Sequence, residues 1–257
     1  MRVARLAKRL RQYDWAAAFM ELLIVVVGIL IALRLSTWNQ ERIDHARAEN
    51  FYRRIHADLL TDRGNIDLTL AYWTKVSTYG REAIDNGENG KRVDGSNWKT
   101  VLAWYQASQI LPFELADTTF NEMRSTGDLG LIADENLRKK LADYYRLSGT
   151  GVEAMILNHD PVYRKQIRGL TPWRVQRYIW NHCFRETSMA DQQLLDCPSP
   201  ISDREAAGIL AIYRRSPALL DNLRTWMSTL RISRIVLRDT RNTAAGLAAE
   251  VAAAERQ

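Results

Sequence analysis

The stretch from Phe19 to Leu33 constrains this chain more than any other. Eleven of its fifteen residues are Leu, Ile, Val or Phe, and their insertion into a bilayer contributes about −5 kcal/mol at roughly −0.3 to −0.6 kcal/mol per residue. Glu21 opposes insertion, but an acid near one end of a span costs only about 2–3 kcal/mol or less. The run predicts a transmembrane helix over residues 15–37. The alternative is the core helix of a soluble domain, for which so long an unbroken apolar run is unusual.

Aromatic and basic residues flank the run, as they do at membrane interfaces. Trp15 and Trp38 are 23 residues apart, which is about 34 Å of helix at ~1.5 Å per residue and matches a hydrocarbon core of ~30 Å. Arg34 lies close enough to the far end for its side chain to reach the headgroups. We therefore interpret Trp15, Trp38 and Arg34 as interface anchors in contact with the lipid bilayer.

The distribution of charge predicts the orientation. Residues 1–12 hold five basic residues and no acid, so the positive-inside rule keeps residues 1–14 as a cytoplasmic tail and sends residues 38–257 across the membrane. A cleaved signal peptide is the rival interpretation, but no small-x-small cleavage site follows the apolar run. Without those five residues, 31 basic residues stand against 30 acidic ones. The net charge of +6 is thus a topology signal, and we expect no nucleic-acid partner.

One face of the predicted span is less apolar than the rest. Gly28 and Ala32 form a small-xxx-small pair that lets another helix approach closely, and an intramembrane carboxyl such as that of Glu21 usually faces a partner. Alternatively, Glu21 simply reaches the cytoplasmic headgroups. The predicted contact face, for self-association or for another envelope protein, comprises Ala18, Glu21, Val25, Gly28 and Ala32.

The chain has two cysteines, Cys183 and Cys197, both in the predicted outer domain. An even pair in an oxidising compartment favours a disulfide, and closing a loop of about 15 residues would stabilise the fold by roughly 3 kcal/mol. Two free buried thiols remain the alternative. A zinc site that adds His182 lacks a fourth ligand at a suitable spacing, so no metal or other cofactor is expected.

The remaining pattern predicts an all-α fold, in which the transmembrane helix continues as a long helix and is followed by a helical bundle. Apolar residues at three- and four-residue steps extend this helix to about Ile84, with a bend near residues 62–65. Residues 85–96 contain three glycines and predict a loop or short hairpin, since two ligand positions of a calcium loop fail at Gly87 and Ser96.

Further helices are predicted from their start and stop signals. Ser96 starts a helix through Gln109, and Ser202 starts another with a capping box. The other predicted helix starts are Asp117 or Thr118, Asp134, Thr171-Pro172 and Ser216-Pro217. A helix end is predicted at Gly127, an interruption by glycines at 149–151, and a kink at Pro161. Residues 187–201 predict a polar loop. No stretch shows sustained two-residue alternation, which would indicate strands.

Two blocks of the sequence resemble a family of bacterial single-pass inner-membrane proteins of unknown function. The residues that carry the resemblance are ELLIVVVGILIAL (21–33), TWNQER (37–42) and TFNEMRSTGDLGLI (119–132), continued by Leu137, Arg138, Tyr144 and Tyr145. Arg34 and Ser36 depart from that pattern. The resemblance implies an inner-membrane anchor with a helical periplasmic domain, and it implies no activity and no catalytic residue.

No motif of known chemistry is found, so we do not expect an enzyme. The four histidines form no metal-binding pair, and phosphate-binding or nucleophile-elbow loops are absent. A basic and aromatic patch that could meet an acidic partner or headgroups is formed by Arg164, Arg168, Trp173, Arg174 and Arg177. Its alternative is an ordinary charged helix surface.

These observations favour a membrane-anchored periplasmic helical interaction or scaffold protein. A ligand-binding or sensory bundle that acts through a membrane partner is the alternative, and an unrecognised envelope enzyme is a third. A deep pocket with convergent polar groups would favour the second or third, and a flat apolar patch would favour the first.

Overall fold

The computed structural model describes residues 15–111, 113, 115–156, 160–188 and 191–256. The chain divides into two units, residues 1–50 and 51–257. The fold is all-α, as predicted, with a long apolar N-terminal helix and a helical bundle. The basic tail and the side chain of Trp15 lie outside the described residues.

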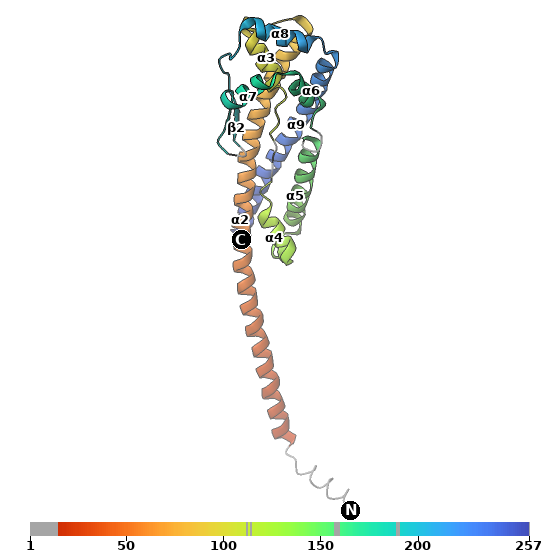
Figure 1. The fold of residues 1–257 in the computed structure, drawn as a ribbon. Helices are drawn as coiled ribbons and strands as arrows, with labels where there is room; N and C mark the ends of the chain where they lie inside the picture. Colours follow the sequence, from red (N-terminus) through yellow and green to blue (C-terminus); the bar gives the residue numbers. More distant parts are fainter. Residues whose placement is uncertain (1–14, 112, 114, 157–159, 189–190, 257) are drawn as a thin grey trace, which may run out of the picture. The chain divides into compact units, whose positions relative to one another are not determined.

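The first unit contains the beginning of helix α2 (Trp15–Asn89) (Figure 1). Its large apolar side chains from Phe19 to Leu35 are all exposed. Among the described residues, this is the one helix long and apolar enough to cross a membrane. Its length and composition are those of an anchor and also of a signal sequence.

In the second unit, α2 buries one face against the bundle. Its fully buried residues recur at helical spacing, and they include Ile55, Leu59, Ile66, Trp73 and Val76. Helical structure is unbroken through residues 62–65, so no interruption appears at the predicted bend.

The predicted end of this helix at Ile84 is wrong, because α2 continues to Asn89. The Asn86 side chain accepts a hydrogen bond from Trp104 Nε1 at 3.1 Å and donates one to the carbonyl of Lys91 at 2.8 Å. A Cβ on Gly87 would lie 2.9 Å from Leu220 Cδ1, so this helix position accommodates little more than a glycine. Tertiary packing thus overrides two residues that locally favour a turn.

The bundle around α2 is built from short helices with local caps. Ser96 and Ser202 accept hydrogen bonds from the backbone N–H groups of Lys99 and Glu205, as predicted. The elements are η1 (Val93–Gly95), α3 (Asn97–Gln106), α4 (Thr118–Thr126), η2 (Asp128–Leu131), α5 (Glu135–Ile156), α6 (Val162–Leu170), α7 (Trp173–His182), α8 (Asp203–Arg214) and α9 (Pro217–Ala254).

Several predicted boundaries differ from the structure. Helix α3 ends at Gln106, before the predicted Gln109. Helix α5 runs through Gly149 and Gly151, because isolated glycines weaken a helix without necessarily ending it. Pro161 and Pro172 precede α6 and α7 as cap residues, so Pro161 is a helix start and not a kink.

A small antiparallel hairpin begins just before the predicted polar loop of residues 187–201: β1 (Phe184–Glu186) precedes the loop, and β2 (Gln192–Leu194) lies within it. Phe184 pairs with Leu194 in its register. Cys183 directly precedes β1, Cys197 follows β2 after Leu195 and Asp196, and the two form a disulfide with a Cα–Cα distance of 5.3 Å. The bond therefore closes the base of the hairpin.

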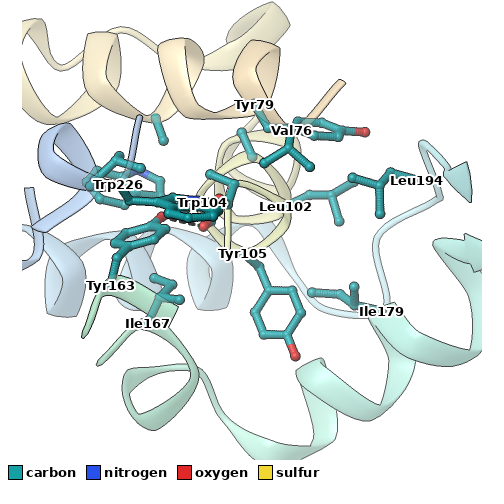
Figure 2. Packing of buried hydrophobic residues seen from close by; sticks show 14 of the residues in the cluster. Val76, Tyr79, Leu102, Trp104, Tyr105, Tyr163, Ile167, Ile179, Leu194 and Trp226 are labelled. Atoms are coloured by element: carbon teal, nitrogen blue, oxygen red, sulfur yellow. Dashed lines mark hydrogen bonds between the residues drawn. The ribbon is translucent and has the colours of Figure 1, made fainter. Parts of the chain in front are cut away.

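Helix α3 lies at the centre of the core, with nine of its ten residues buried. Figure 2 shows side chains from α2, α3, α6 and α9 meeting around Trp104 and Tyr105. Buried indoles keep hydrogen-bond partners: Trp73 Nε1 donates to the carbonyl of Leu111 at 3.2 Å, and Trp226 Nε1 donates to that of Ala107 at 2.8 Å. This core packs α2 and α9 against α3.

Candidate functional site

The predicted transmembrane contact face is exposed in the structure. Val25 is 53% exposed, and nothing lies within 4 Å of the position that a Cβ on Gly28 would occupy. Glu21 and Ala32 are likewise exposed, and Ala18 is half-buried. The face is thus accessible to lipid or to another helix, and its role as a contact stays a prediction.

Two of the predicted interface anchors are also exposed. Trp38 is 62% exposed, and the Arg42 guanidinium lies 5.9 Å from the centre of its ring. Arg34 is exposed one turn earlier. An amphipathic indole beside cationic side chains suits a membrane interface.

The cysteine pair is a disulfide, which leaves neither sulfur as a thiolate ligand. His182 stacks on Tyr178 with ring centres 4.2 Å apart. Within the described ranges, no cluster of three or more His, Cys, Asp or Glu side chains could hold a metal ion.

The predicted basic and aromatic patch is divided between the interior and the surface. Arg164 donates to the carbonyl of Ser108 at 2.7 Å, and burial lowers its pKa to about 10. The Arg168 guanidinium lies over the rings of Tyr105 and Trp180 at 5.5 and 5.3 Å. These two arginines therefore stabilise the contact between α3, α6 and α7.

The other three residues of that patch lie on α7. Trp173 is 70% exposed, and Arg174 forms an ion pair with Glu205 of α8. Arg177 lines a shallow pocket with Tyr178. The cationic character of this surface is partly neutralised, so it is a weaker anion site than the sequence suggests.

A different basic site lies between α2 and α9. The two helices approach closely at Gly80, where a Cβ would lie 2.0 Å from Met227 Sδ. Beside this contact is a cavity of about 530 Å³, which we call the arginine groove. It is lined by Thr74, Ser77, Arg81 and Ile84 of α2 and by Met227, Arg231, Arg234, Ile235 and Arg238 of α9.

Arg234 occupies the middle of the arginine groove. Its Nη2 donates to Thr74 Oγ1 at 3.0 Å, and its Nη1 donates to Ser77 Oγ at 3.3 Å. Both hydroxyls donate in turn to backbone carbonyls of α2 at 2.7 and 2.8 Å. The Nε of Arg234 is buried and has no hydrogen-bond partner among the described residues.

The electrostatics of the arginine groove are unbalanced. Burial lowers the pKa of Arg234, and the neighbouring charges of Arg238 and Arg81 lower it further. No carboxylate lines the groove, and among the described residues none of its four arginines forms an ion pair. The charge of Glu82, next to Arg81 in the chain, acts on Arg81 from outside the groove, and the groove lining itself holds no carboxylate that would offset the repulsion between its arginines.

Other arginines of α9 form ion pairs with carboxylates of α2. Arg224 is paired with Glu88 at 2.7 Å, and Arg241 is paired with Asp67 at 2.6 Å. These pairs join the same two helices on either side of the groove. Among the described arginines of α9, Arg231, Arg234 and Arg238 form no such ion pair, and this central segment is therefore suited to an external anion.

Part of the arginine groove could be predicted from the sequence. Arg231, Arg234 and Arg238 recur at three- and four-residue steps and so share a helix face. Arg81 lies about 150 residues earlier and is brought beside them only by the packing of α2 on α9. The groove could not be assembled without that contact.

A second polar cluster lies between α2 and α5. Asp62 is fully buried and accepts hydrogen bonds from the backbone N–H of Ala116 at 2.7 Å and from Tyr144 Oη at 2.8 Å. Burial raises its pKa to about 6. Asp58 Oδ2 and Tyr145 Oη are buried nearby without a hydrogen-bond partner in the described chain.

No family model matches the sequence, and no curated protein and no solved structure matches it either.

Proposed function

We propose that this chain is a membrane-anchored periplasmic interaction protein whose helical domain binds an anionic partner in the arginine groove. The observation that carries the proposal is the set of four arginines without a carboxylate in the groove lining. Uncompensated charge at a concave surface costs stability unless an anion neutralises it.

The proposed location is the inner membrane, with a single span, a cytoplasmic N-terminus and a periplasmic C-terminal domain. It is supported by the apolar helix at the N-terminal end and by the disulfide, since disulfides persist in oxidising compartments. The resemblance of residues 21–33 and 119–132 to single-pass inner-membrane proteins supports the same placement.

The alternative proposal, a ligand-binding or sensory bundle that acts through a membrane partner, is favoured by the shape of the same site. The arginine groove is concave and combines convergent polar groups with the apolar side chains of Ile84, Met227 and Ile235. In this alternative, a small molecule occupies the groove and alters the contact with a partner.

The experiment places a photocrosslinking amino acid in the groove at Ile235, in cells that produce the full chain. Ile212 on α8 is the matched control, since the two isoleucines are 45% and 40% exposed. We expect adducts specific to position 235 that disappear when Arg231 and Arg238 are replaced by glutamate. Identical adducts at both positions, or adducts that survive the charge reversal, contradict the proposal.

A further inference from the structure

We propose that the arginine groove binds a phosphate group, carried either by a lipid or by a soluble organic molecule. This inference rests on the proposed function, because it concerns the same site, and it adds the chemical class of the ligand. Three steps support it: the kind of hydrogen-bonding group that the groove offers, the number of donors, and the apolar part of its lining.

The polar surface of the groove offers donors and few acceptors. The Thr74 and Ser77 hydroxyl protons are directed to the carbonyls of Leu70 and Trp73, and both oxygens accept from Arg234. A guanidinium has donors and no acceptor. A ligand that complements this surface must therefore supply acceptors, which an ionised oxyanion does and an amide or a sugar hydroxyl alone does not.

The number and closeness of the donors favour a phosphate over a single carboxylate. Each guanidinium carries five N–H groups, and among the described contacts Arg231 and Arg238 spend none of theirs on a carboxylate. Arg81 and Arg238 lie near enough to Arg234 to lower its pKa, so three cations surround one region. A phosphate with several oxygens and up to two charges can satisfy more of these donors at one point.

The rest of the lining indicates that the phosphate is attached to a larger body. Ile84, Met227 and Ile235 border the groove, and its volume of about 530 Å³ exceeds what an inorganic ion needs. A phospholipid headgroup and a soluble phosphate ester share this chemistry. The two sources are distinguished by whether the phosphate must be presented on a bilayer.

The test uses the purified full chain in detergent and measures binding by calorimetry. The soluble probes are inorganic phosphate and glycerol 3-phosphate, with acetate at equal ionic strength as the comparison. The bilayer probes are phosphatidylcholine vesicles, in which the choline ammonium neutralises each phosphate, and the same vesicles with phosphatidylglycerol, whose phosphate keeps its negative charge. Binding of a soluble phosphate, or of the phosphatidylglycerol vesicles alone, supports the inference and identifies the source.

The variants are Arg234→Gln and Arg238→Gln, with Arg224→Gln as the matched control. Arg224 lies on the same helix and loses the same charge, but it is paired with Glu88 outside the groove. We expect each groove variant to weaken phosphate binding at least about tenfold, as the loss of a charge-assisted hydrogen bond does, and the control to change it less than about twofold. Arg238 is exposed, so its variant remains informative if Arg234→Gln folds poorly.

Equal weakening by Arg224→Gln, binding of acetate as tight as that of phosphate, or no binding of any probe would overturn the phosphate inference. The proposed function fails differently, when the crosslinks at Ile235 prove independent of the groove charges. Groove-dependent crosslinks together with absent phosphate binding would leave the interaction proposal standing and remove this one.

Discussion

The phenol of Tyr144 donates a hydrogen bond of 2.8 Å to the buried carboxylate of Asp62 and thereby joins α5 to α2. The backbone N–H of Ala116 donates a second hydrogen bond to the same carboxyl group. These bonds favour the ionised form, but burial outweighs them and raises the pKa to about 6. The bundle therefore contains a carboxyl group with a pKa of about 6.

The first prediction is a pH-dependent stability that depends on Asp62. Its pKa is about 6 when folded and 3.8 in the reference state, so the folded chain binds this proton more tightly. The stabilisation is complete below about pH 4 and is lost as the pH rises through about 6, with a total near 2–3 kcal/mol. Asp62→Asn should flatten this dependence relative to the wild type.

Urea unfolding at a series of pH values between 4 and 8 measures the effect as the difference between wild type and variant. Asp143→Asn is the control, because Asp143 lies on the outside of α5 in an ion pair with Arg146. If the Asp62 and Asp143 variants follow the same curve, the assignment to Asp62 is incorrect.

The second prediction concerns the close approach of α2 and α9. Gly80→Ala should destabilise the second unit by about 1–3 kcal/mol, because the new Cβ would lie 2.0 Å from Met227 Sδ and 3.0 Å from its Cγ. Gly64→Ala is the matched control on the same helix, where nothing lies within 4 Å. It should stabilise by about 0.5–1 kcal/mol through helix propensity.

Thermal or urea unfolding compares the two glycine variants. The double variant Gly80→Ala with Met227→Ala should recover part of the loss, since it removes the side chain that blocks the new methyl group. Equal effects at Gly64 and Gly80 would show that α9 does not pack against α2 at this point.

The third prediction concerns the disulfide between Cys183 and Cys197. Replacing both residues by alanine should lower the free energy of unfolding by roughly 3 kcal/mol, because the bond closes a loop of about 15 residues in the unfolded chain. When cells are lysed in the presence of a maleimide reagent, the reagent should label the wild-type cysteines only if a reductant has been added first. Labelling without a reductant would place the cysteines in a reducing compartment and contradict the periplasmic assignment.

The residues show which features could be predicted from the sequence. Caps at Ser96 and Ser202 were predicted correctly because each acts within one helical turn. The end of α2 was missed because Asn86 is bonded to Trp104 and Gly87 lies close to Leu220, contacts that no local pattern of residues 85–96 shows.

The arginine groove was also missed, because it depends on contacts that local sequence patterns do not show. The sequence pointed to the cluster around Arg164 and Arg168, but Arg164 donates to the carbonyl of Ser108, just after α3, and Arg168 lies over the ring of Tyr105. The arginine groove needs Arg81 and Arg234 from helices far apart in the chain. Local sequence patterns predict where a helix begins. They do not determine which arginines form ion pairs with carboxylates of another helix, because those pairs depend on how the helices pack.

The last prediction is that the arginine groove costs the unliganded domain stability. Arg238 is exposed and, with Arg81, lowers the pKa of Arg234, so Arg238→Gln should raise the midpoint of thermal unfolding slightly by relieving repulsion. Arg241→Gln should not raise it, because Arg241 has a carboxylate partner in Asp67. The gain from Arg238→Gln should shrink as salt screens the repulsion. A variant that is less stable than the wild type at low salt would show that Arg238 makes a favourable contact within the chain, and the groove would then need no external anion.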